Sequence, residues 1–109
     1  MNSNSLENGL LLMMTTESNF SNAKKLANKI LSMKLASCIN FTRCESMYWW
    51  EDELKEDFEI QLLIKTKEDL VDELFNVIKN NHSYKVPELI CFKAMAGKDY
   101  IRWVFGATN

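Results

Sequence analysis

Three cysteines and a single histidine are the residues of this chain that could hold a metal ion. Cys38 and Cys44 lie six positions apart, Cys91 follows much later, and His82 is the only histidine. Thiolates suit Cu(I), whereas imidazole suits Cu(II) or Zn(II). Six residues of extended chain span about 20 Å, so Cys38 and Cys44 would share an ion only through a bend or a second chain. Small buried thiols are the commoner role for free cysteines.

Acidic side chains crowd one stretch of the sequence. Seven of the fifteen acidic residues lie between Glu45 and Glu59. Such a cluster attracts cations, but it also protects a long exposed strand edge from aggregation, and we favour protection. The sequence has no phosphate-binding glycine loop and no nucleophile motif, and His82 has no evident catalytic partner. At the end of the second long helix, His82 would also interact favourably with the free carbonyls of that helix. We therefore predict a protein that is not an enzyme.

The residue pattern predicts the helices and strands that position these side chains. The expected elements are a strand at 9–16, a helix from Ser18 or Asn19 to about Lys34, strands at 37–50 and 56–66 around a turn at 51–55, a helix at 67–81, a strand at 89–96 and a short final helix capped by Asp99. Thr66 and Asp69 resemble a capping box for the second long helix. Tyr100, Trp103 and Val104 predict a packing stripe on the final helix. This order is the α+β, ferredoxin-like arrangement, βαββαβ plus a C-terminal helix.

The two middle strands predict a hairpin that is too long for its own subunit. About 14 extended residues reach about 45 Å, whereas a compact domain of this length has a radius of gyration near 13 Å. The expected tip carries Met47, Tyr48, Trp49 and Trp50. Large aromatic surface of this kind usually marks an interface, so the sequence predicts an oligomer.

Length and composition predict one domain at residues 9–109 behind a polar, disordered tail at residues 1–8. The net charge of −2 provides no basic stripe, so we do not expect a nucleic-acid partner. The longest apolar run, residues 10–14, is too short to cross a membrane. The first residues lack the features of a secretion signal, and an odd number of cysteines fits reduced thiols. We therefore expect a cytoplasmic protein.

Five motifs resemble the CutA family of divalent-ion tolerance proteins, from Leu10 almost to the end of the chain. The motifs are Leu35-Ala36-Ser37-Cys38-Ile39-Asn40, Ser46-Met47-Tyr48-Trp49-Trp50, Glu59 followed by Ile64-Lys65-Thr66, His82-Ser83-Tyr84-Lys85-Val86-Pro87-Glu88, and Tyr100-Ile101-Arg102-Trp103. The resemblance implies a PII-like homotrimer whose long hairpins wrap neighbouring subunits. It also implies a role in tolerance of copper or another divalent cation.

The chain departs from this family at several positions. Thr42-Arg43 stands where the family usually has Pro-Gly, so a bulge expected in the hairpin should be altered or absent. Asp52 replaces a common glycine of the turn, and Ser83 replaces a proline. Some members bind copper through a cysteine and two histidines, where this chain has Met14, Asn81 and His82. The resemblance therefore implies weak metal binding by His82 and Met14, with Cys38 as a further thiolate ligand if the first two strands are adjacent.

Seven residues are expected at an intersubunit cleft or interface: Tyr48, Trp50, Glu59, Lys65, Tyr84, Glu88 and Trp103. They could bind a ligand there, or form only ion pairs and hydrogen bonds between subunits. The favoured interpretation is a trimeric, cytoplasmic protein that binds divalent cations. The alternative is a PII-like signalling scaffold that binds a small anion or a partner protein and has no physiological metal.

Overall fold

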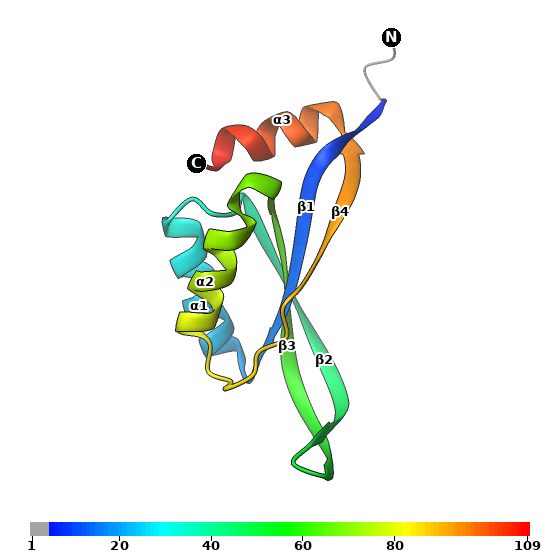
Figure 1. Ribbon diagram of the computed structural model, residues 1–109, viewed down its shortest axis with the longest axis vertical. Coiled ribbons are helices and arrows are strands. Elements are labelled where there is room, and N and C mark those ends of the chain that lie inside the picture. Colours follow the sequence, from blue (N-terminus) through cyan, green and yellow to red (C-terminus); the bar gives the residue numbers. More distant parts are fainter. Residues whose placement is uncertain (1–4) are drawn as a thin grey trace.

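A computed structural model describes residues 5–109 and shows a four-stranded antiparallel sheet with helices on both faces (Figure 1). The elements are β1 (Leu6–Glu17), α1 (Phe20–Ser32), β2 (Cys38–Trp50), β3 (Glu53–Lys67), a 3₁₀ turn (Glu68–Leu70), α2 (Val71–Asn81), β4 (Ile90–Gly97) and α3 (Lys98–Ala107). The strands are ordered β2-β3-β1-β4, which confirms the predicted ferredoxin-like arrangement. Among the described residues, no helix is both long and apolar enough to span a membrane.

β1 begins earlier than the sequence predicts. Residues 6–8 pair with residues 95–97 of β4, although their side chains remain exposed. The prediction of a disordered tail is therefore wrong for residues 6–8, and residues 1–4 lie outside the described part of the chain. The polar residues of this segment suggested disorder, but backbone pairing with β4 needs no buried side chain. The register shifts between Asn8 and Leu10, where Gly9 adopts a φ of 132° that suits glycine.

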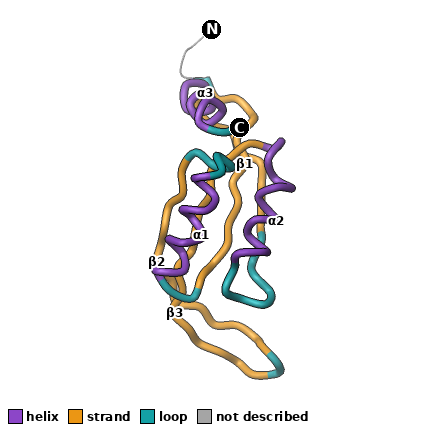
Figure 2. The backbone as a smooth tube through the Cα atoms, turned by 90° about the vertical axis from the view of Figure 1, so that its left-hand side faces the viewer, coloured by secondary structure: helices purple, strands orange, loops and turns teal. Residues whose placement is uncertain are grey.

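The main core lies between the sheet and the two long helices, which run side by side over one face (Figure 2). The largest fully buried apolar side chains of this core are Met13, Leu26, Ile30, Leu35, Leu62, Ile64, Leu74 and Ile78. All of them except Leu35, which lies in the loop after α1, come from one face of each helix or from alternate strand positions. Asn19 is the N-cap of α1, and its side-chain oxygen accepts from the Asn22 backbone N–H at 2.8 Å.

The predicted capping box at Thr66 is wrong. β3 continues through Lys67, so Thr66 is still a strand residue, fully buried, and its hydroxyl donates to the Leu35 carbonyl at 2.7 Å. The chain then forms the 3₁₀ turn before α2 starts at Val71. In this described segment, no side chain caps the start of the 3₁₀ turn or the start of α2. The Thr66 hydroxyl, which was predicted to be the cap, is used in the core instead.

α3 lies at the end of the sheet away from the hairpin turn (Figure 1), and its contacts with Leu10 and Leu12 place it on the face opposite α1 and α2. Ile101 and Val104, three residues apart, pack on Leu10 of β1. The predicted stripe is therefore wrong in part: Val104 is buried, but Tyr100 and Trp103 are 37% and 49% exposed. Asp99 is not the cap either, since α3 begins at Lys98 with Gly97 as its N-cap residue.

In the hairpin, β3 is longer than predicted, whereas β2 begins at Cys38, one residue later than expected. Its register runs without interruption from the Cys38–Lys65 pair to the Trp50–Glu53 pair, so within the described hairpin no bulge occurs at Thr42-Arg43. The turn contains only Glu51 and Asp52, with φ values of 50° and 65°, rather than residues 51–55. Two positive φ values in a two-residue loop match the twist of the strands. Asp52 therefore adopts the left-handed geometry that the replaced glycine would adopt and that aspartate tolerates.

The hairpin projects beyond the helices, as predicted (Figure 1). The molecule measures 54 × 25 × 21 Å and has a radius of gyration of 15.2 Å. A compact domain of this length would have a radius near 13 Å. Ile60, Leu62 and Ile64 continue one apolar face under the helices, but Phe58 on the same face lies beyond them and is 77% exposed.

Candidate functional site

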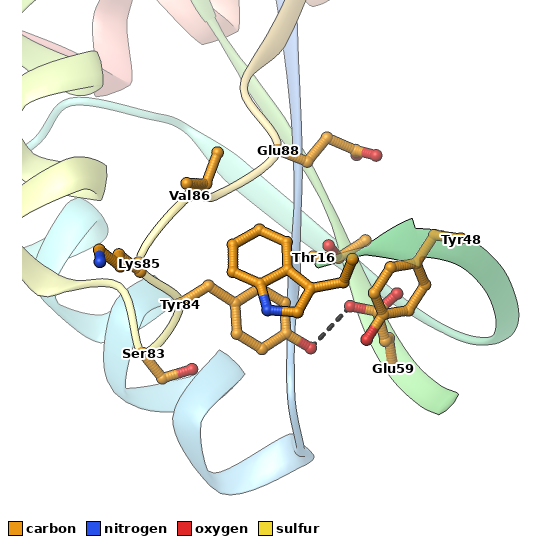
Figure 3. A pocket seen from close by; sticks show the side chains of 9 residues that line it. Thr16, Tyr48, Glu59, Ser83, Tyr84, Lys85, Val86 and Glu88 are labelled. Atoms are coloured by element: carbon orange, nitrogen blue, oxygen red, sulfur yellow. Dashed lines mark hydrogen bonds between the residues drawn. The ribbon is translucent and has the colours of Figure 1, made fainter. Parts of the chain in front are cut away.

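A cavity of about 400 Å³ lies where the hairpin leaves the body of the protein (Figure 3). Its lining includes Thr16 of β1, Tyr48 and Trp50 of β2, Glu59 of β3, and Tyr84 and Glu88 of the segment after α2. Strand alternation places the strand residues on the face opposite α1 and α2, because Cys44 pairs with Glu59 and Tyr48 pairs with Lys55. The cavity therefore joins three strands to the loop at residues 82–89.

Two tyrosines donate hydrogen bonds to carboxylates at this cavity. The Tyr84 hydroxyl donates to Glu59 Oε2 at 2.6 Å, and Glu59 is only 8% exposed (Figure 3). Burial, and next the hydrogen bond to Glu59, raise the pKa of Tyr84. The Tyr48 hydroxyl donates to Asp57, and that bond, followed by burial, raises the pKa of Tyr48. Both phenols therefore keep their protons at neutral pH.

Glu88 supplies a second carboxylate to the cavity. Its Oε2 atom is buried and is the one buried side-chain oxygen or nitrogen without a hydrogen-bond partner among the described residues. A buried acceptor of this kind costs free energy unless a donor reaches it. Glu88 thus marks a place where a donor from outside the chain would be favourable.

A buried network behind the cavity fixes the loop that delivers Tyr84. The Glu17 carboxylate accepts from the Ser18 N–H at 3.1 Å and from both the N–H and the hydroxyl of Ser83, the N–H at 3.0 Å. A proline at position 83, as in the resembled family, would offer neither donor. Nothing in the sequence pattern singled out Glu17, apart from its being a carboxylate at the end of an apolar strand.

His82 belongs to the same network, with its side chain fully buried. Its Nδ1 accepts from the Tyr84 N–H at 2.9 Å and lies 3.6 Å from Glu17 Oε2, while its Nε2 lies 3.1 Å from Thr15 Oγ1. A nitrogen that accepts a hydrogen bond carries no proton, so Nε2 is the protonated nitrogen and donates to Thr15. Both ring nitrogens are therefore occupied.

The structure does not bring the three expected metal ligands together within one chain. His82 contacts Thr15 on the face that carries α1 and α2, whereas Met14, the preceding residue of β1, points to the opposite face. Cys38 lies on β2, which β3 separates from β1. The condition set for Cys38, adjacent first and second strands, is therefore not met. The described residues contain no group of three or more His, Cys, Asp or Glu side chains placed to hold an ion.

The expected cleft residues fall into two groups. Five of them line the cavity: Tyr48, Trp50, Glu59, Tyr84 and Glu88. Lys65 and Trp103 lie elsewhere, beside α3: the Lys65 ammonium is 5.8 Å from the Tyr100 ring centre, and that ring is 5.7 Å from Trp103. Thr16 lines the cavity although its sequence context gave no signal.

Comparisons with known proteins agree on one family. Residues 11–106 match the family model described as CutA1 divalent ion tolerance protein. The chain is 40% identical over 101 residues to Protein CutA 1, chloroplastic, of Oryza sativa subsp. japonica, which covers 91% of this chain and 57% of the rice protein. It therefore spans little more than half the length of this plant relative. It is 33% identical to the divalent-cation tolerance protein CutA of Pyrococcus horikoshii, covering 92% of this chain and 99% of that protein.

Solved structures show the same fold. The crystal structure of CutA1 from Oryza sativa superposes with a TM-score of 0.88 and 36% identity, and covers 99% of this chain and 98% of the rice chain. The fold class predicted from the sequence is thereby confirmed.

Proposed function

Because the chain belongs to the CutA1 family of divalent ion tolerance proteins, we propose that it acts in divalent-cation tolerance as a cytoplasmic homotrimer that catalyses no reaction. The names of the Pyrococcus and other relatives support the role in tolerance. Three free thiols support a reducing compartment. The single structural observation that carries the proposal is the apolar surface of the overhanging hairpin.

Both faces of this hairpin carry large apolar side chains in water. Trp49 and Phe58 are 73% and 77% exposed, and Met47 and Leu54 extend the same face. Tyr48 and Trp50 lie on the other face, which continues into exposed Ile90 and Phe92 of β4. A monomer rarely exposes contiguous surface of this kind. Copies of the chain that exchange hairpins around a closed ring would cover both faces at once.

We propose that copper or another divalent cation binds weakly, through ligands from more than one copy. Met14 and Cys38 support this, because strand alternation places both sulfur atoms on the sheet face that assembly would cover. Thioether and thiolate ligands suit Cu(I). His82 would join them only after its contacts with Thr15 and Tyr84 break, so it is the least available of the three ligands.

A second candidate function is that of a PII-like ligand-binding scaffold. The cavity with its unpartnered Glu88 oxygen is the observation that favours it. From the sequence, such a scaffold is expected to bind a small anion or a partner protein. Glu59 and Glu88 both line the cavity, and two carboxylates disfavour an anion there.

The proposed function is tested in cells that lack their own relative of this protein. Wild-type chain is expected to form trimers by light scattering and to restore growth at elevated copper. The double change Trp49→Asp and Phe58→Asp should abolish both, whereas the control Glu56→Gln on the same exposed face should change neither. Failure of the wild type to restore growth would reject the role in tolerance. Full protection by a monomeric double variant would show that assembly is not needed.

A further inference from the structure

We propose that a second cavity, on the helix side of the protein, binds a phosphate group. This cavity, which we call the helix-face cavity, has a volume of about 350 Å³. It lies where the start of α1 and the end of α2 meet the first residues of the 82–89 loop (Figure 1). The inference goes beyond the proposed role in tolerance and does not depend on it. It follows from the position, the charges and the hydrogen-bond donors of the helix-face cavity.

The position of the helix-face cavity keeps it clear of the surfaces that assembly is proposed to cover. Those surfaces are the hairpin and the sheet face opposite α1 and α2. Among the described residues, Ser83 alone lines both the helix-face cavity and the cavity beside the hairpin. The rest of the helix-face lining includes the end of α2 and one stripe of α1, formed by Asn22, Lys25, Leu26 and Lys29. This side of the molecule therefore stays open to a ligand in the assembled protein.

The charges of α1 favour an anion in the helix-face cavity. This helix contributes Lys25 and Lys29 to the lining and contains no acidic residue. Two lysines one turn apart repel each other. None of the ion pairs among the described residues includes either of them. The helix ends do not decide the sign, because the start of α1 carries a positive partial charge and the end of α2 a negative one. A bound anion would therefore relieve the repulsion between the two lysines.

The acidic group of the lining is already engaged within the protein. The Glu17 side chain is 1% exposed, and its carboxylate accepts hydrogen bonds from Ser18 and Ser83. His82 also belongs to the lining, and both of its ring nitrogens are occupied. An anion in the helix-face cavity would thus meet two exposed ammonium groups and one buried, hydrogen-bonded carboxylate. The balance of charge is positive.

Two side-chain amides add donors to the ammonium groups. Asn22 Nδ2 donates to Ser18 Oγ at 3.0 Å, and Asn81 Nδ2 donates to the Val77 carbonyl at 2.8 Å. Each amide nitrogen carries two protons, so one N–H of each remains for a ligand. A phosphate group concentrates three acceptor oxygens and a charge of about −1.5 to −2 at one point, whereas a carboxylate has two oxygens and one charge. The donors of the cavity therefore suit phosphate better than carboxylate.

The test is an NMR titration of the assembled protein, in which the amide shifts report both affinity and location. The probes are glycerol 3-phosphate, inorganic phosphate, succinate and glycerol. We expect glycerol 3-phosphate to shift the amides of residues 22–29 and 81–83 and to bind at least about threefold more tightly than succinate, a dianion with separated charges. Glycerol should not bind. Weaker binding of inorganic phosphate would support a phosphate ester as the ligand, and equal binding would support the free ion. Equal binding of succinate and both phosphates would overturn the phosphate assignment, and unchanged spectra with both phosphates would overturn the proposal.

Variants locate the binding. Lys25→Gln and Lys29→Gln should each weaken binding of glycerol 3-phosphate by about threefold or more, and the double variant by about tenfold or more. Lys24→Gln is the matched control and should change binding by less than about twofold. Lys24 is an exposed lysine of the same helix, but its ammonium lies 5.6 Å from the centre of the Phe20 ring and does not line the cavity. Equal losses in all three single variants would reject the cavity, because they would show only general attraction to a basic helix.

A second change guards against variants that misfold. Asn22→Asp places a negative charge in the first turn of α1, where it favours the helix, and should abolish binding of glycerol 3-phosphate. Light scattering and circular dichroism confirm assembly and folding of each variant. Binding that survives both Asn22→Asp and the double lysine change would reject the proposal. Growth at elevated copper, which tests the role in tolerance, depends on none of these probes, so the two proposals can fail separately.

Discussion

Replacing Glu17 with glutamine should destabilise the protein by about 2–4 kcal/mol. The Glu17 carboxylate accepts three hydrogen bonds, from the Ser18 N–H and from the N–H and hydroxyl of Ser83. Glutamine keeps one oxygen and puts an amide NH₂ in place of the other. Whichever way it turns, the NH₂ group faces one backbone N–H, either that of Ser18 or that of Ser83.

The magnitude follows from these contacts. One buried N–H without an acceptor costs about 1–3 kcal/mol, and the remaining bonds lose their charge assistance, which adds about 1 kcal/mol. The Ser83 hydroxyl can rotate to accept from the new NH₂ group, which limits the loss. Because Ser83 precedes Tyr84, the damage should fall on the loop that delivers Tyr84 to the cavity.

Urea unfolding at fixed protein concentration measures the free energy, and hydrogen exchange locates the change. Faster exchange is expected at the Ser83 and Tyr84 amides, with little change in the helices. Glu7→Gln is the matched control, an exposed acid of the same strand, and should stay within about 0.5 kcal/mol of wild type. A loss below about 1 kcal/mol for Glu17→Gln, or unchanged exchange in the loop, would refute the reasoning.

Three further predictions concern pH, metal and the turn. The raised pKa of Tyr84 means that its protonated form stabilises the fold, so this stability is complete below about pH 10 and is lost as pH rises further. In Tyr84→Phe, the loss of stability with rising alkaline pH, followed by circular dichroism, should be less steep than in the wild type. An unchanged pH dependence would contradict this. Titration against a competing chelator should find weak copper binding that favours Cu(I); tight Cu(II) binding that survives His82→Ala would show the ligand assignment to be wrong. Asp52→Gly should stabilise the hairpin by up to about 1 kcal/mol in urea unfolding, because Asp52 has a φ of 65°, and a loss of stability would show that the aspartate side chain supports the turn.

Local patterns were sufficient for the elements and for the overhang. Helical spacing identified the buried faces of α1 and α2, and Asn19 lies where the N-cap was expected. Such signals act between residues a few positions apart, so they survive in the sequence alone. The number of extended residues in β2 and β3 was enough to predict a hairpin longer than its own body.

Only the tertiary structure decided which face of the sheet a side chain occupies and which distant residues form hydrogen bonds with each other. The Ser83 N–H donates to Glu17 across a separation of 66 residues. The Thr66 hydroxyl donates to the Leu35 carbonyl instead of capping the helix, as the sequence had predicted. Met14 and His82 looked like two ligands of one ion, but the pleat of β1 sends Met14 to the face opposite His82. Sequence patterns report the period of a segment, whereas these contacts depend on which strands become neighbours, and insertion of β3 between β1 and β2 is a property of the whole sheet.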